Sequence, residues 1–299
     1  RIFLGLGMGG EWASGAARVS EWWRAGHRGK ARGFMQRAWA VGYGAAALVT
    51  AIVMPRWGWR AVFFVGVVPA LLTIWVQKRV EEPVIWRERR AAPTARRGSL
   101  ADIFTGALLR LTIPVTLMNA CTMFAWWGFN QWIPAYLSLP VDQGGIGLST
   151  TTMSGFVVFM QVGMFLGYVT FGFISDAFGR KRTYVVYLAA AAVLLLGYSV
   201  TRSSLALLLL GPVVAFFATG YFSGFGAVTA EIYPTEIRAT AQGFTYNIGR
   251  LASAVAPFAV GSLAASNGFG LAFSIAALSF VLAAVLWAWI PETRGRALE

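Results

Sequence analysis

The sequence has few charged residues and almost no cysteine. Charged side chains make up 12% of the 299 residues, whereas a soluble domain carries about 25%. Its single cysteine, Cys121, lies in an apolar stretch and cannot form an intrachain disulfide. There is one histidine, His27, and no cluster of metal-ligating or nucleophilic residues. The sequence therefore argues against an enzyme, a metal site or a bound cofactor.

Apolar residues dominate what is present. They make up 57% of the chain, the mean hydropathy is +0.62, and the chain has 13 Trp and 34 Gly. Trp gathers at membrane interfaces and Gly allows transmembrane helices to pack closely. The net charge of +13 comes from basic clusters between apolar runs, with no continuous basic face, so we expect a lipid bilayer as partner and no nucleic acid.

The apolar runs predict an all-α membrane protein. A bilayer core needs about 20 apolar residues per helix. Nine segments meet this requirement, and we place them at 1–22, 33–54, 59–77, 109–138, 151–174, 183–201, 204–230, 239–264 and 270–290.

The basic residues predict the orientation of these spans. Eighteen Lys and Arg residues fall on the side of the membrane that holds residues 23–32, against three (Arg56, Arg60 and Arg202) on the other side. By the positive-inside rule the first side is cytoplasmic. We therefore expect a multi-pass protein of the plasma (bacterial inner) membrane, with a cytoplasmic C-terminus and cytoplasmic loops at 23–32, 78–108, 175–182 and 231–238.

The chain contains an internal repeat with an offset of 210 residues. Without a gap, Glu21 falls on Glu231, Arg28 on Arg238, and a Gly-Phe pair follows in both copies; further matches are Gly58 with Gly268, Phe63 with Phe273 and Glu82 with Glu292. Parallel repeats of this kind build many transporters. The second copy has three spans before the counterpart of segment 1–22, and the chain starts at Arg1 within an apolar stretch. We therefore expect three further N-terminal helices, roughly 100 residues, in the natural protein.

Four motifs resemble the major facilitator superfamily. They are the loop signature 172–182 (GFISDAFGRKR), the Glu231–Arg238 stretch EIYPTEIR, the terminal stretch 291–299 (PETRGRALE) and the arginine motif that begins at Arg1. The EIYPTEIR stretch and the terminal stretch resemble its sugar-porter-like branch, and the motif at Arg1 resembles the arginine motif of its fourth helix. Gly7–Trp12 with Tyr246–Arg250 resembles its carboxylate and metabolite symporters of the lactate and sialate type. The resemblance implies nine of twelve helices: 1–77 as helices 4–6, 78–108 as a cytoplasmic linker and 109–299 as helices 7–12.

Charged loop residues are candidates for a conformational latch. Asp176, Arg180, Glu231 and Arg238 would lie at the cytoplasmic ends of neighbouring helices, with Glu21 and Arg28 as the equivalents in the first repeat. Ion pairs between them could form in one state of two rocking bundles and break in the other. The alternative is that these charges only set the topology.

An arginine inside a predicted span is the strongest candidate for substrate binding. Arg250 lies near the middle of its helix, with Tyr246 and Asn247 on the same face. An ionisable group within a span is costly and is a functional hypothesis by default. Its guanidinium could bind a carboxylate bidentately, or it could make a structural pair.

Polar and aromatic residues on other spans extend this hypothesis. Asn119, Trp126 and Asn130 share a face of span 109–138, with Gln131 beside them, and Gln161 adds a polar group on the next span. Transporters of this shape usually line their cavity with that helix. Plain packing is the alternative for each of these residues.

Two residues near the start of the chain are candidates for proton coupling. Glu11 lies among glycines in the middle of a span, where a carboxyl could take up and release a proton or could bond a neighbouring helix. Arg1, as the resemblance implies, could lie beside a proton-coupling acid.

The resemblance implies proton-coupled symport of a small organic anion, a carboxylate or an acidic sugar, by alternating access. A neutral sugar or polyol symporter, with Arg250 in a structural role, and a non-transporting sensor are alternatives. Drug efflux fits less well, because the stretch 41–45 lacks the Pro of the signature that efflux proteins carry there. We expect a monomer that binds a small molecule and a proton.

Overall fold

The computed structural model describes residues 15, 18–19, 22–23, 27–79 and 99–296. These residues fold almost entirely into helices and include no β-strand, which confirms the all-α prediction. The elements are α2 (Arg28–Val65), α3 (Val68–Arg79), η2 (Leu100–Phe104), α5 (Gly106–Ser138), η3 (Val141–Gln143), α6 (Thr150–Phe178), α7 (Arg180–Val200), α8 (Ser204–Ile232) and α9 (Arg238–Leu286).

Five of the described helices are long and apolar enough to cross a membrane. They are α5, α7, α8, α9 and the part Gly155–Phe178 of α6. With 49 residues, α9 is more than twice the length of about 20 residues that one crossing needs. The protein is therefore a multi-pass membrane protein.

The backbone repeats the 210-residue offset of the sequence. α2 begins at Arg28 and α9 at Arg238, and each helix bends where a glycine leaves helical geometry: Gly58 with φ 73° and ψ 176°, and Gly268 with φ 81° and ψ 163°. Positive φ is easy for Gly and costly for other residues. These bends separate the predicted spans 33–54 and 59–77 in one copy and 239–264 and 270–290 in the other.

The predicted span 59–77 is interrupted in the structure, because α2 ends at Val65 and α3 starts at Val68. The backbone N–H of Val67 donates to the carbonyl of Phe64, which tightens the chain into a turn. Pro69 follows at the second position of α3. Proline has no N–H to continue a helix but is well tolerated in a first turn, so a new helix starts here.

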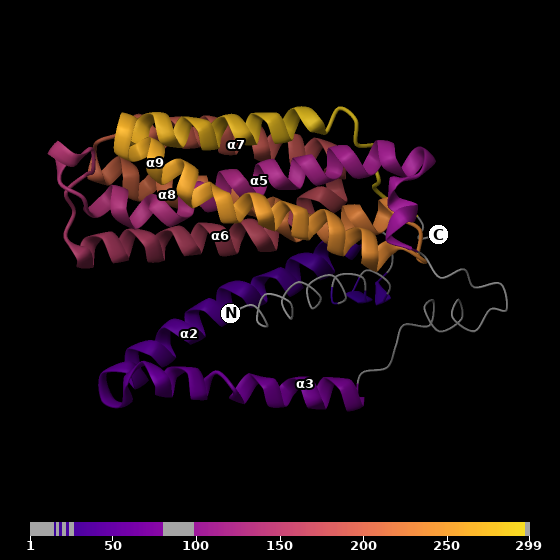
Figure 1. The fold of residues 1–299 in the computed structure, drawn as a ribbon, viewed down its shortest axis with the longest axis horizontal. Coiled ribbons are helices and arrows are strands. Elements are labelled where there is room, and N and C mark those ends of the chain that lie inside the picture. The colour runs from indigo at the N-terminus through magenta and orange to yellow at the C-terminus, as the bar shows by residue number, and fades with distance from the viewer. Residues whose placement is uncertain (1–14, 16–17, 20–21, 24–26, 80–98, 297–299) are drawn as a thin grey trace.

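Helices α5 to α9 form one bundle, in which α5 packs along α9 and α6 along α8 (Figure 1). The Trp132 indole of α5 donates to the carbonyl oxygen of Pro257 in α9 at 2.7 Å. A Cβ added at Gly163 of α6 would lie 2.0 Å from the carbonyl oxygen of Pro212 in α8. Only glycine allows the two backbones to come this close.

Aromatic side chains form part of the core of this bundle. Phe129 of α5 meets Tyr198 of α7 with ring centroids 5.5 Å apart, and Tyr136 of α5 meets Phe273 of α9 at 5.3 Å, both edge to face. Edge-to-face pairs add to the stability that burial alone provides. The cluster therefore joins three helices of the bundle.

α2 and α3 lie along one side of the bundle, with α2 packed against α6 and α8 and α3 on the outer side of α2 (Figure 1). The apolar side chains of α3, such as Leu71 and Trp75, are exposed among the described residues. An apolar surface of this size requires lipid or further protein around it.

Candidate functional site

A cavity of about 380 Å³ lies where α2 faces α5 and α9. This volume falls within the range of roughly 300–1,000 Å³ that is typical of small-molecule sites. Its walls come from both copies of the repeat, since α2 and α9 are equivalent helices. The lining residues are Gly15, Met35, Gln36, Ala38, Trp39, Met123, Trp127, Tyr246, Arg250 and Ser253.

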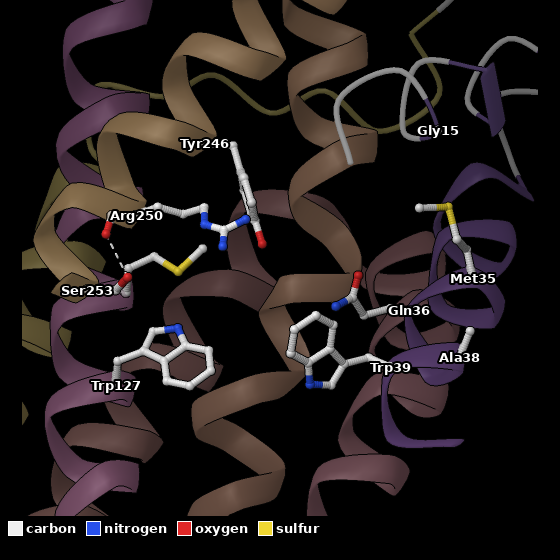
Figure 2. A pocket seen from close by; sticks show the side chains of 10 residues that line it. Gly15, Met35, Gln36, Ala38, Trp39, Trp127, Tyr246, Arg250 and Ser253 are labelled. Carbon is white, nitrogen blue, oxygen red and sulfur yellow. Dashed lines mark hydrogen bonds between the residues drawn. The ribbon is translucent and has the colours of Figure 1, made fainter. Parts of the chain in front are cut away.

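Polar side chains meet at one end of this cavity. Figure 2 shows Arg250 and Tyr246 of α9 pointing toward the space that the amide of Gln36 in α2 faces from the opposite wall. Arg250 is the charged member of the lining set, it is half-buried, and its guanidinium makes no ion pair with a carboxylate in the part of the chain that the structure describes. Such a guanidinium can bind a carboxylate through two parallel hydrogen bonds.

The other end of the cavity is aromatic. Trp127 of α5 and Trp39 of α2 project into it from opposite walls (Figure 2). Trp39 is 46% exposed, so part of its ring is available for contact with a ligand. The cavity thus offers a cation with hydrogen-bonding groups at one end and two indole rings at the other.

The structure brings two of the predicted substrate-binding residues, Arg250 and Tyr246, into the lining of the cavity. Two others make bonds to backbone. Asn247 donates from its side-chain amide to the carbonyl oxygen of Gly243 in its own helix at 2.8 Å. Asn119 is 1% exposed and donates to the carbonyl oxygens of Thr245 at 3.1 Å and Tyr246 at 3.3 Å, so it bridges α5 and α9.

The remaining predicted residues lie outside the lining set. Trp126 is buried and packs on Phe129, with ring centroids 6.3 Å apart. Asn130 and Gln161 are half-buried, and Gln131 is exposed. Substrate contacts of these side chains stay predictions.

Eight of the ten lining residues were not predicted from the sequence, among them Gln36, Trp39 and Trp127. The repeat held a signal for Gln36, since a shift of 210 residues places it on Tyr246. Trp127 directly follows the predicted Trp126, and adjacent residues point about 100° apart around a helix. The predicted residue therefore lies at nearly the same height along α5 as the lining residue, but on a different face of the helix.

The two candidates for proton coupling, Glu11 and Arg1, lie outside the described residues. So does Glu21 of the first repeat. Arg28 begins α2, but its side chain is not among the described ones.

The latch residues of the second repeat gather around Arg180. Its guanidinium donates to both carboxylate oxygens of Glu231, at 3.0 and 3.3 Å. It also donates to Asp176 and to the hydroxyl of Ser175. Arg180 is 1% exposed. A buried charge of this kind depends on its partners, because desolvation makes it costly alone.

Asp176 also connects the two repeats. Its second carboxylate oxygen accepts a hydrogen bond from the backbone N–H of Lys30 at 3.1 Å. Lys30 lies in the first turn of α2. A helix N-terminus carries partial positive charge and unpaired N–H groups, which favours an anion there. The carboxylate therefore joins α6 and α7 to the start of α2.

The C-terminal segment completes this cluster. The hydroxyl of Thr293 donates to Glu231 at 2.7 Å. The carboxylate of Glu292 accepts from the backbone N–H groups of Arg180 at 2.8 Å and Lys181 at 3.1 Å and so caps α7. Partial burial would raise the pKa of Glu292, but these bonds and those from Thr293 and Arg294 outweigh it and lower the pKa below its usual value.

Arg238, the fourth predicted latch residue, is also buried. Its Nε donates to the carbonyl oxygen of Ala230 at 3.0 Å, which ties the start of α9 to the end of α8. The structure thus gathers Asp176, Arg180 and Glu231 in one network and places Arg238 on a backbone contact beside it.

The sequence profile described as Major Facilitator Superfamily matches residues 1–167 and, a second time, residues 138–298. The chain belongs to this superfamily. Two overlapping matches, which together span almost the whole chain, agree with the repeat seen in the sequence and in the bends at Gly58 and Gly268.

Relatives in the superfamily are transport proteins rather than enzymes. The chain is 31% identical to a putative metabolite transport protein of Haemophilus influenzae, over 100% of this chain and 74% of that one. It is 30% identical to a cis,cis-muconate transport protein of Acinetobacter baylyi, over 96% of this chain and 70% of that one. Among solved structures, the major facilitator proton:xylose symporter XylE aligns with a TM-score of 0.72 at 21% identity, over 95% of this chain and 68% of that one.

Proposed function

We propose that this protein is a secondary transporter that carries a small organic anion, a carboxylate or an acidic sugar, together with a proton. This proposal rests mainly on the position of the Arg250 guanidinium at the polar end of a cavity between the two repeats. A charged side chain inside an apolar bundle costs free energy, so its presence there indicates a function. A carboxylate that enters the cavity would supply the negative charge.

A relative of known description supports the proposal that the substrate is an anion. The Acinetobacter baylyi relative is described as carrying cis,cis-muconate, which is a carboxylate. Its identity of 30% over 96% of the chain makes an anion the first class of substrate to test.

The proposed mechanism is alternating access. The cavity would open to one side of the membrane and then to the other as the two bundles rock about it. The network of Asp176, Arg180 and Glu231, with the bond from Lys30, would hold the cytoplasmic side closed in one state and break in the other. Glu11 and Arg1 are proposed to couple the proton.

The proposed location is the bacterial inner membrane, with the latch network and the loops 23–32, 78–108, 175–182 and 231–238 facing the cytoplasm.

Two matched variants of the full-length protein test the substrate class. Uptake of labelled muconate, sialic acid and xylose is measured in cells that express the wild type, Arg250→Gln, or Arg110→Gln as control. Arg110 is an exposed residue near the start of α5, outside the cavity lining.

We expect Arg250→Gln to reduce uptake of the transported anion about ten- to a hundredfold, because a hydrogen bond to a charged group contributes about 1.5–3 kcal/mol. Arg110→Gln should transport normally, and a protonophore should abolish accumulation. Uptake of no anion, or anion uptake that does not respond to Arg250→Gln, would contradict the proposal.

A neutral sugar is the second candidate, because Gln36 and Tyr246 can hydrogen-bond to uncharged hydroxyl groups. In that case xylose uptake should survive Arg250→Gln and fall on replacement of Gln36.

A further inference from the structure

The cavity is polarised along its length. Arg250 and Tyr246 lie at one end with Gln36 on the facing wall, and the rings of Trp39 and Trp127 enter the other end from facing walls (Figure 2). The thioether side chains of Met35 and Met123 also belong to the lining. A ligand that fills this space therefore needs a polar, anionic end and an apolar body.

The two indole rings restrict the shape of that body. Trp39 comes from α2 and Trp127 from α5, so a ligand between them touches both repeats of the protein. Aromatic rings favour stacked or edge-to-face contacts with other π systems. A flat ring can use both indoles at once, whereas a puckered ring or a short aliphatic chain leaves part of this surface unused.

The polar groups argue in the same direction. Tyr246 and Arg250 lie together at one end with Gln36 on the facing wall, and the hydroxyl of Ser253 donates to the backbone carbonyl of Arg250 at 2.7 Å. A sugar acid carries hydroxyl groups around its whole ring, and the two indoles offer these groups N–H donors but no acceptor, so part of their hydrogen bonding to water would be lost. A planar acid has its polar atoms at one end and avoids this cost.

The volume limits the size of the ligand. At about 380 Å³ the cavity lies near the lower end of the range of roughly 300–1,000 Å³ for small-molecule sites. A single ring with a carboxylate suits this space better than an oligosaccharide or a long-chain acid.

We infer that the cavity selects a planar, conjugated carboxylate: its carboxylate pairs with Arg250 and its ring lies between Trp39 and Trp127. This inference rests on the proposed function and narrows the anion to a chemical class. Arg250 binds the charge of any carboxylate, and the two tryptophans discriminate between flat and non-planar bodies.

Benzoate and cyclohexanecarboxylate form the probe pair, because they share a carboxylate and a six-membered carbon ring and differ in planarity. Their Kd values are measured by competition on the purified full-length protein. The variants are Trp127→Leu and Trp39→Leu, with Trp127→Phe as the conservative replacement. Trp57→Leu is the control, since Trp57 is a 64% exposed tryptophan of α2 outside the lining set.

The wild type should bind benzoate more tightly than cyclohexanecarboxylate. Trp127→Leu or Trp39→Leu should raise the Kd of benzoate about three- to tenfold, which corresponds to the free energy of an aromatic pair contact. The Kd of cyclohexanecarboxylate should change by less than about twofold in the same two leucine variants. Trp127→Phe should restore much of the preference, and Trp57→Leu should behave as the wild type.

Four results overturn the inference. Equal binding of the two acids, or equal weakening of both by the leucine variants, would remove the role of the tryptophans and leave the role of Arg250 intact. Binding of lactate or sialic acid without either ring acid would do the same. Failure of every carboxylate to bind would overturn the inference and the proposed function together.

Discussion

Helices α2 and α9 are equivalent in the two repeats, but their surroundings differ. Both start at an arginine and bend at a glycine 30 residues later, at Gly58 and at Gly268. Beyond the bend, Phe63 is 73% exposed while its repeat partner Phe273 is 0% exposed, because α9 packs along α5 and α7. The backbone follows local sequence in both copies, and burial follows the neighbours that each copy meets.

The same comparison explains the asymmetry of the cavity. Gln36 and Tyr246 are repeat partners and line it from opposite walls. The repeat partner of Arg250 is Ala40, so the cation belongs to one copy alone. A cavity between two similar backbones therefore has its charge on one wall, which orients an anionic ligand.

The largest effect that we expect comes from the repeat partners Glu231 and Glu21. Glu231→Gln leaves Arg180, which is 1% exposed, with one carboxylate partner in place of two. Breaking a buried ion pair costs about 3–5 kcal/mol, so thermal unfolding of the purified protein should show a large loss of stability. Glu21→Gln should cause a similar loss if the first repeat holds the same network.

Asp142→Asn, an exposed acid in η3, is the control for both variants. A loss below about 1 kcal/mol in Glu231→Gln, typical of a surface pair, would contradict the prediction. A loss for Glu231→Gln alone would show that the two repeats differ at this end as they do at the cavity.

A medium effect is expected at the two bends. Alanine at Gly58 or Gly268 must adopt positive φ with extended ψ, a region occupied almost only by glycine, which costs about 1–3 kcal/mol, and an added Cβ meets no atom within 4 Å at either position. The two variants should therefore lose equal stability on unfolding of the purified protein. Gly42→Ala, where the added Cβ also meets nothing within 4 Å, should be neutral or stabilising, because alanine favours a helix. Unequal losses would break the equivalence of α2 and α9.

The smallest effect is expected from Glu292, the repeat partner of Glu82. The pKa of Glu292 is lower in the folded protein than the usual value, so its charge stabilises the fold above the ordinary carboxyl range near about 4.3 and stops doing so as the pH falls through the lowered value. Because Glu292 is exposed, we expect less than about 1 kcal/mol.

The measurement is the difference in Tm between wild type and Glu292→Gln from pH 7 to pH 3. It should shrink toward zero at the acidic end. A difference that grows with acidification would contradict the sign of this prediction. Glu82→Gln tests whether the first repeat has the same cap on a helix.

Much of the fold could be predicted from the sequence. Spans of about 20 apolar residues must be helical in a bilayer, where every backbone polar group needs an internal partner. The offset of 210 residues predicted the equivalence of α2 and α9 before their bends were known. The break between α2 and α3 was missed, since it depends on the turn at Gly66 and on Pro69 within a continuous apolar run.

The candidate site could be predicted only in part. Arg250 and Tyr246 were found because an ionisable residue inside a span is rare and its helical neighbours at spacings of three and four share its face. Asn119 has the same chemical character, but its amide bonds to two backbone carbonyls of α9. Polarity within a span does not distinguish a residue that faces a cavity from one that joins two helices.

The sequence by itself determined the membrane character of this protein, its helices, its repeat and the presence of a cation within a span. These follow from composition, run length and periodicity, which are local properties of the chain. The tertiary structure decided that Arg250 faces Gln36 and that Trp127 faces Trp39 across one cavity. Such pairs depend on how α2 packs against the bundle, and the packing of two helices is set by the whole surface between them.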